Sequence, residues 1–185
     1  FLFDGVRAGE RCLYITLSET KEELEAGAHS HGWSLEGVKV VELVAEEADL
    51  DAEAQLTMYH ASDLELAETT KRVLAAIEEI QPTRLVFDSL SELRLLAQSA
   101  LRYRRQILAF KQFFTGRKCT VLLLDDKTAE ISDLQLHSIA HGVISLEQHT
   151  PAYGSARRRL QVLKFRGTDF RGGFHDYTIR QGGLY

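Results

Sequence analysis

The chain has 185 residues, a formal net charge of −5 and a hydrophobic share of 44%. This length suits one domain with a sizeable core, and the composition excludes a disordered chain or a protein that coats nucleic acid by charge alone. No apolar run approaches the roughly 20 residues that cross a bilayer, and no signal-like segment opens the chain, so we expect a cytoplasmic protein without a membrane anchor.

The first ten residues, FLFDGVRAGE, open the chain without Met and in the middle of an apolar pattern. They are typical of the last turns of a helix that ends in glycines. We therefore expect the chain to be a fragment of a longer protein. Cys12 and Cys119 both lie in apolar, strand-like runs, which indicates buried reduced thiols.

Strand and helix patterns alternate along the first two thirds of the chain. We expect strands at 12–17, 38–44, 84–88 and 119–126, a helix starting near Ser18 or Thr20, a loop or short helix at 45–62, a helix at 63–80 before Pro82, and after the third strand a helix broken near Gln98. Strands that alternate with helices predict parallel pairing with right-handed crossovers.

The last third has no helical pattern between its strands. Strand candidates at 142–148, 157–167 and 174–180 are joined by short turns. They predict an antiparallel extension of the same sheet. Since there is no internal repeat and no flexible linker, we expect residues 1–185 to form a single α/β domain.

Asp88 raises the question of function, because it ends the apolar strand RLVFD. A carboxylate in that place is costly to desolvate unless it meets a donor or a metal. The carboxyl ends of parallel strands are also where open α/β sheets bind ligands. The alternative is that Asp88 caps the helix that follows.

Four segments together resemble the KaiC branch of the RecA-type ATPases: YITLSET at 14–20, RLVFDSLSEL at 84–93, SDLQLHSIAHGVISLEQ at 132–148 and RRRLQVLKFRGTDFRGGFHDYTI at 157–179. The resemblance implies a RecA-like three-layer α/β fold, with a mostly parallel sheet and C-terminal antiparallel strands. It also implies an ATPase that uses ATP and Mg²⁺ in a homo-oligomeric ring, a hexamer, with a role in signal transduction and a signalling protein as a further partner.

The resemblance assigns roles to individual residues. Asp88 corresponds to the Walker B carboxylate, which supports Mg²⁺ through water, and Glu19 to the glutamate that polarises the attacking water. Lys164, Arg166 and Thr168 correspond to residues that reach the nucleotide of the neighbouring subunit. A strand with period two would place these three side chains on one face.

The sequence departs from the family pattern in three places. No G-x-x-x-x-G-K-[ST] phosphate loop is present, so we expect that loop upstream of Phe1 and no ATPase activity in this chain alone. Ser18 precedes Glu19 where the kinase-competent members have a second glutamate, which disfavours autokinase activity. Only Ser138, after His137, is left as a candidate phosphoacceptor.

Alternatives remain for each assignment. Glu19 suits a first-turn helix acid, and Lys164 and Arg166 suit solvated strand charges. Two groups of arginines either form ion pairs with acidic residues or form a basic rim that binds nucleic acid. They are Arg157, Arg158 and Arg159, and Arg102, Arg104 and Arg105. The rival functions are a DNA-binding recombinase relative, against which the negative net charge argues, a protein autokinase, and an inactive scaffold of the same fold.

Overall fold

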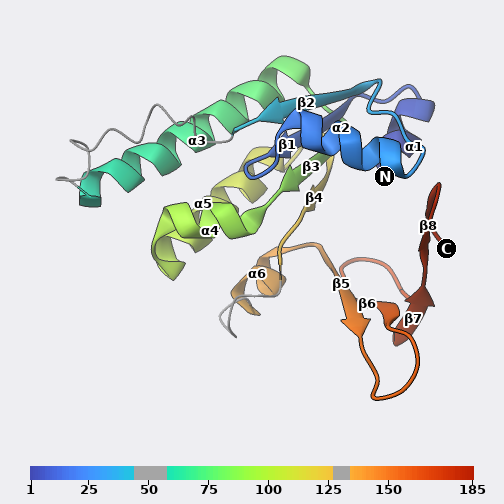
Figure 1. Cartoon of the computed structure of the whole chain (residues 1–185). Helices are drawn as coiled ribbons and strands as arrows, with labels where there is room; N and C mark the ends of the chain where they lie inside the picture. Colours follow the sequence, from blue (N-terminus) through green and yellow to red (C-terminus); the bar gives the residue numbers. More distant parts are fainter. Residues whose placement is uncertain (44–57, 127–133) are drawn as a thin grey trace.

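A computed structural model describes residues 1–43, 58–126 and 134–185, and the fold is reported for these ranges (Figure 1). Residues 45–57 of the loop or short helix expected at 45–62 lie outside them. The helices are α1 Leu2–Arg7, α2 Lys21–Ser30, α3 Met58–Ile80, α4 Leu90–Ala97, α5 Ala100–Phe114 and α6 Leu134–Ile139. The strands are β1 Cys12–Thr16, β2 Val38–Glu42, β3 Arg84–Asp88, β4 Thr120–Leu123, β5 Gly142–His149, β6 Arg157–Phe165, β7 Phe174–Tyr177, β8 Ile179–Arg180 and β9 Gly183–Leu184.

A parallel sheet with strand order β2-β1-β3-β4 forms the centre of the fold. This confirms the parallel pairing expected from the alternating strands and helices. In the register of the two central strands, Cys12 lies level with Arg84 and Thr16 lies level with Asp88. The first residues of the two strands, and therefore also their last residues, lie side by side.

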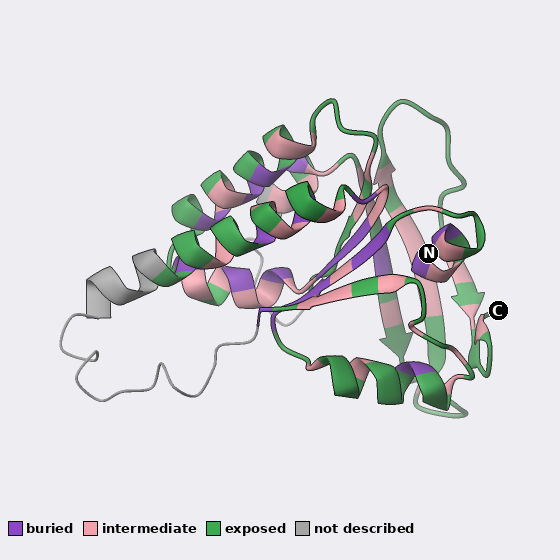
Figure 2. Cartoon of the chain, turned by 90° about the horizontal axis from the view of Figure 1, so that it is seen from above, coloured by how far each residue is buried: buried purple, intermediate pink, exposed green. Residues whose placement is uncertain are grey.

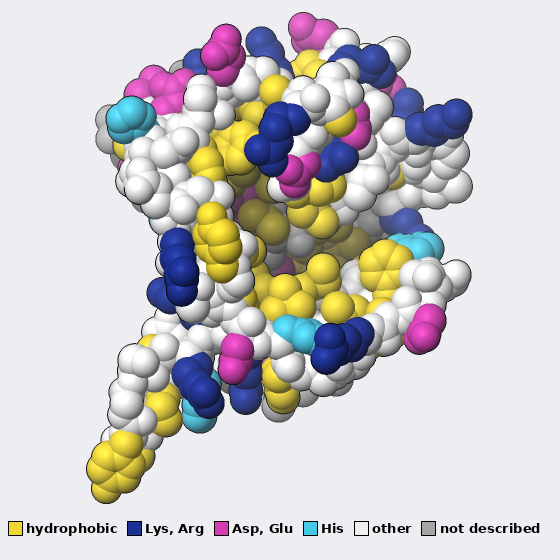
Figure 3. All heavy atoms as spheres, turned by 90° about the vertical axis from the view of Figure 1, so that its right-hand side faces the viewer, with side chains coloured by type: hydrophobic (Ala, Val, Ile, Leu, Met, Phe, Trp, Pro, Cys, Tyr) yellow, Lys and Arg dark blue, Asp and Glu magenta, His cyan; other side chains and the backbone are white. Residues whose placement is uncertain are grey.

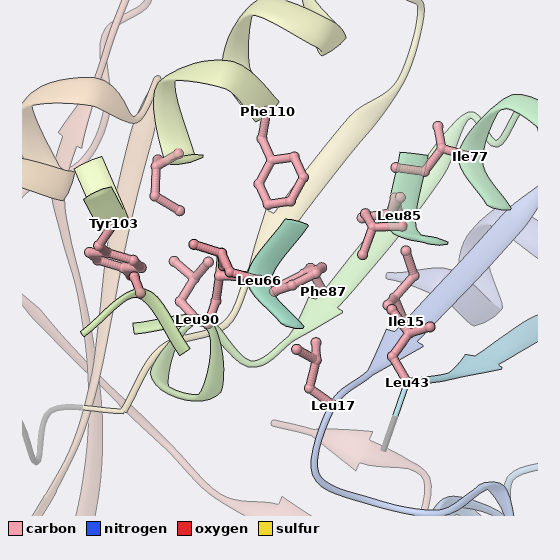
Figure 4. Close-up of a cluster of buried hydrophobic side chains, with 14 of the residues drawn as sticks. Ile15, Leu17, Leu43, Leu66, Ile77, Leu85, Phe87, Leu90, Tyr103 and Phe110 are labelled. Carbon is pink, nitrogen blue, oxygen red and sulfur yellow. The ribbon is translucent and has the colours of Figure 1, made fainter. Parts of the chain in front are cut away.

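Helices α3, α4 and α5 cover one face of this sheet, where the larger core lies (Figures 1 and 4). Alternation along β1 turns Leu13 and Ile15 to this face, level with Leu85 and Phe87 of β3. The ring of Phe87 packs against that of Phe110 of α5, with 5.8 Å between the ring centroids. As Figure 2 shows, the buried residues concentrate in the sheet and on the helix faces turned toward it.

Local sequence signals explain where the helices start and stop. Thr20 caps α2 and forms a capping box with Glu23, as one of the two expected starts. Gln98, in the left-handed conformation with φ 53°, separates α4 from α5 and confirms the expected break. Helix α3 begins at Met58, five residues before the expected start at 63.

The opposite face of the parallel sheet carries a smaller core. Leu2 of α1 packs there with Cys12 and Val86. Leu122, which lies level with Val86 on β4, is 36% exposed. Figure 3 shows a hollowed side of the molecule in which hydrophobic side chains line the hollow.

The C-terminal strands form sheets of their own. Strands β5, β6 and β7 pair antiparallel in that order, and β8 pairs with β9. In the described part of the chain, no pairing joins them to the parallel sheet, so the expected extension of that sheet is wrong. Strands β5 and β6 follow each other in sequence without a helix between them, and they pair with each other as a hairpin.

None of the helices in the described ranges is both long enough and apolar enough to cross a membrane.

Helix α4 offers a matched test of the core. Leu93 is fully buried, whereas Leu95 on the same helix is 71% exposed. We expect Leu93→Ala to lower the free energy of unfolding by about 2–5 kcal/mol, because it removes buried methyl groups and leaves a cavity. Leu95→Ala should change the free energy of unfolding by no more than about 0.5 kcal/mol. Urea denaturation followed by circular dichroism measures both, and equal effects would contradict the assigned core.

Candidate functional site

The carboxyl ends of β1 and β3 meet at one edge of the parallel sheet. Thr16 and Asp88 lie level, and the N–H of Leu17 donates to the backbone carbonyl of Asp88 over 2.7 Å. The chain therefore leaves both strands at the same place. This edge brings Glu19 and Asp88 into one neighbourhood, although 68 positions separate them in sequence.

Asp88 is half-buried, and a tyrosine holds its carboxylate. The hydroxyl of Tyr14 donates to Asp88 Oδ2 over 2.5 Å. Burial, the hydrogen bond to Asp88 and the charges of Asp88 and Glu19 raise the pKa of Tyr14 above its ordinary range, so its hydroxyl is a donor at neutral pH.

Asp88 is not the cap of the next helix. The N-cap of α4 is Ser89, and it makes no side-chain capping bond. The capping alternative for Asp88 is therefore wrong. In the described ranges, the hydroxyl of Tyr14 is the group that hydrogen-bonds to the Asp88 carboxylate, and the accepting oxygen is Oδ2.

Glu19 lies in the turn between β1 and α2, and its side chain is exposed. Thr16, which is fully buried, fixes this turn: its Oγ1 accepts from the N–H of Glu19 over 2.9 Å and donates to the Glu19 carbonyl over 2.9 Å. Helix α2 begins only after Thr20, and Glu22 and Glu23 are the acids of its first turn. The alternative of Glu19 as a first-turn helix acid is therefore wrong.

A second set of contacts ties β3 to β4 at the same edge. The N–H of Leu90 donates to the Leu124 carbonyl over 2.8 Å. Asp125 accepts from Arg94 over 2.6 Å and from the Ser91 hydroxyl over 3.3 Å. The turn after Asp88 is therefore held by the next strand, on the side away from Glu19.

The chemistry of this edge suits a hydrated divalent cation beside a phosphate. Mg²⁺ is commonly held by one or two carboxylates together with waters and substrate phosphates. Within the described residues, no group of three or more His, Cys, Asp and Glu side chains is placed to hold a metal ion by itself, without waters or phosphates. Asp88, with one carboxylate oxygen held by Tyr14, matches the first arrangement.

Sequence reasoning missed Tyr14, Thr16 and Asp125. The period of β1 carried a signal for the first two, because residues 12, 14 and 16 share one strand face and end at the edge that carries Asp88. The pattern did not reveal that β3 is the neighbouring strand. It therefore did not reveal that Asp88 lies within reach of Tyr14. Asp125 closes an apolar strand, as Asp88 does, and that signal was equally readable.

Lys164 and Arg166 bind the end of helix α6. Lys164 Nζ donates to the carbonyls of His137 over 2.5 Å and Ala140 over 2.8 Å, and Arg166 donates to the carbonyl of Ser138 over 2.7 Å. Lys164 is half-buried, so the alternative of a solvated strand charge is wrong for it, whereas Arg166 is exposed and follows the end of β6. Partial burial, together with the nearby charges of Arg166 and Lys111, lowers the pKa of Lys164.

The structure does not bring these cations to Glu19 or Asp88 within one chain, as far as the described residues show. Strand β6 also ends at Phe165, two residues before Gly167, which has φ 80°. The expectation that one strand face carries Lys164, Arg166 and Thr168 is therefore wrong, because the chain bends at this glycine. Ser138 is exposed next to the end of α6.

The arginines at the start of β6 differ among themselves. Arg159 pairs with Glu147 over 2.9 Å, as expected, and its guanidinium lies 3.9 Å from the ring centroid of Phe174. Arg157 and Arg158 are exposed. Neither makes an ion pair within the described ranges.

Comparisons with known proteins show the family and the fold of the chain. A family model described as "ATPase: KaiC" matches residues 1–185. The chain belongs to the KaiC ATPase family. A KaiC-like protein from the archaeon Pyrococcus horikoshii OT3 has the same fold, with a TM-score of 0.78 at 20% identity, covering 100% of this chain and 80% of that one.

Curated relatives are similar over almost the whole chain. The circadian clock protein KaiC3 of Synechocystis sp. is 25% identical over 98% of this chain and 34% of its own length. A UPF0273 protein of Thermotoga maritima is 25% identical over 100% of this chain and 78% of its own length. The chain thus spans about a third of the clock proteins that it matches.

The bonds from Lys164 to α6 can be tested by hydrogen exchange. Lys164→Met removes the donor from two carbonyls at the end of the helix. We expect the end of α6 to lose local stability, which raises the exchange of its amides by roughly fivefold. The control is Lys118→Met, at an exposed lysine outside this contact. Unchanged exchange in the Lys164 variant would show that these bonds do not stabilise the helix.

Proposed function

We propose that the protein containing this chain binds ATP with Mg²⁺ and hydrolyses it in a head-to-tail ring, a hexamer, that acts in signalling or regulation. One observation carries the proposal: a held carboxylate, Asp88, and an exposed carboxylate, Glu19, lie at the carboxyl edge of adjacent parallel strands. Ligands of open α/β sheets bind at such an edge. Membership of the KaiC ATPase family supports the choice of ATP.

The two acids have separate roles in this proposal. Asp88 would hold Mg²⁺ through a water, and the chemistry supplied by the bound ion would be neutralisation of phosphate charge. Glu19 orients the attacking water and accepts its proton. The oxygen of that water bonds to the γ-phosphorus while the bond from phosphorus to the bridging oxygen breaks, so that ADP and phosphate leave. Phosphoryl transfer needs this positioning more than covalent help.

The phosphates also need a cradle of backbone N–H groups and a lysine, which the family takes from its phosphate loop. No such motif occurs in these 185 residues. The proposal is therefore for the whole protein, with the phosphate loop outside this chain, and it assigns little or no ATPase activity to residues 1–185 alone.

We place Lys164, Arg166 and Thr168 at the nucleotide of the neighbouring subunit. Lys164 and Arg166 lie together at the end of α6, and the bonds that they donate there go to carbonyls rather than to carboxylates. A carbonyl does not neutralise their positive charge, which supports this role. Arg166 would act as an arginine finger, which neutralises charge in the transition state. Thr168 follows in the exposed bend after β6.

The rival functions explain fewer observations. A DNA-binding relative has exposed Arg157 and Arg158 in its favour, but the chain has a net charge of −5. A protein autokinase would have to modify Ser138, and Ser18 stands where its second glutamate is expected. An inactive scaffold would have no need of both acids at the edge.

Substitution of the two acids in the full-length protein separates binding from chemistry. Glu19→Gln should keep ATP binding and lower turnover by roughly two orders of magnitude, because it removes the base. Asp88→Asn should raise the Mg²⁺ concentration needed for half-maximal turnover. The matched control is Glu22→Gln, in the first turn of α2, which should hydrolyse ATP normally. Calorimetry and phosphate release measure these effects, and normal turnover in Glu19→Gln would refute its assigned role.

Mixing two inactive variants tests whether the site is shared. In a head-to-tail ring every interface is the same contact, so Glu19 of one subunit would meet Arg166 of the next. After random exchange of equal amounts of Glu19→Gln and Arg166→Ala subunits, about a quarter of the sites are intact. We expect the mixture to recover about a quarter of wild-type ATPase activity. No recovery despite confirmed exchange would remove Arg166 from the neighbouring site.

A further inference from the structure

The face of β1 that carries Tyr14 and Thr16 contacts both acids of the proposed site. Residues two apart on a strand point to the same side, so these side chains lie one after the other toward the carboxyl end. Tyr14 lies level with Val86 of β3, two residues before Asp88, and Thr16 lies level with Asp88 itself. A long aromatic side chain reaches such a diagonal neighbour, as the hydrogen bond to Asp88 shows.

Tyr14 fixes the carboxylate of Asp88 through one oxygen. A carboxylate has lone pairs on both oxygens, and a bond of 2.5 Å from the phenol occupies one of those on Oδ2. The bond limits rotation of the carboxylate about its last torsion angle, which is otherwise broad. Oδ1 is thereby set in a fixed direction for a water of the Mg²⁺ shell.

Thr16 fixes the turn that carries Glu19. Its hydroxyl accepts from the N–H groups of Glu19 at 2.9 Å and Ser18 at 3.4 Å, and it donates to the carbonyl of Glu19 at 2.9 Å. The side chain is fully buried, so these bonds form away from competing water. Valine has a similar shape but would leave the backbone groups of Glu19 without these partners.

We propose that Tyr14 and Thr16 are positioning residues for ATP hydrolysis. Tyr14 aligns the metal-supporting carboxylate of Asp88, and Thr16 aligns the turn of Glu19. A single strand face therefore sets the distance between the metal side and the water side of the reaction. This inference rests on the proposed function of the site.

Tyr14→Phe tests the first half in the full-length protein. We expect it to weaken Mn²⁺ binding in the presence of ADP by about 10-fold, the usual scale for a residue that orients a ligand of the metal. Electron paramagnetic resonance of Mn²⁺ measures this without turnover. In an Asp88→Asn background the same change should cause no further loss, because Tyr14 acts through Asp88. The control, Tyr153→Phe, lies at a 93% exposed tyrosine.

Thr16→Val tests the second half. It should lower kcat by about 10-fold while Mn²⁺ affinity and the KM for ATP stay within about twofold of wild type. Thr16→Ser keeps the hydroxyl and should restore kcat. Thr70→Val is the matched structural control, because Thr70 also donates to a backbone carbonyl, that of Leu66 in α3, over 2.7 Å. Thermal denaturation of each variant separates loss of stability from loss of chemistry.

Two results would overturn the inference. One is wild-type Mn²⁺ affinity in Tyr14→Phe, which decides the case even if Thr16→Val does not fold. The other is a folded Thr16→Val whose kcat falls no further than that of Thr70→Val.

The variants Glu19→Gln and Asp88→Asn should be measured in the same series. If they impair turnover while the Tyr14 and Thr16 variants do not, only the positioning inference fails. If they have no effect, the proposed function itself fails.

Discussion

The parallel pairing of β1 with β3 is the interaction on which the rest of the structure depends. Its register sets Thr16 beside Asp88, and the bond from Leu17 to the Asp88 carbonyl extends the pairing beyond the strands. A shift by one residue would turn Leu13 and Ile15 away from the helices that cover them. Burial of the core therefore specifies the same register that brings the two acids together.

The two faces of β1 have different tasks. Leu13 and Ile15 belong to the larger core, whereas the hydroxyls of Tyr14 and Thr16 bond to Asp88 and to the backbone of Glu19. The polar groups are compatible with burial because each finds its partner within the strand edge itself. Rigid packing on one face thus holds the polar groups of the other face in place.

Much of the fold was predictable because its signals are local. Periodicity and turn chemistry indicate the four parallel strands along the chain, the break at Gln98 and the cap at Thr20. The separate C-terminal sheet was not predictable, since strand patterns do not reveal which edge a strand joins. Asp88 and Glu19 were predicted as site residues from their position and the resemblance, and that role stays a prediction. Tyr14 required the neighbouring strand, and the bend at Gly167 required a backbone angle that residue type alone does not fix.

The edge of β4 has a practical consequence. Among the described strands β4 pairs only with β3, and Leu122 and Leu123 at its end, with Leu124 directly after it, are partly exposed. An apolar strand edge with unpaired N–H and C=O groups is a template to which another strand adds. We therefore expect a preparation of these 185 residues to self-associate by edge pairing, which light scattering at several protein concentrations would detect.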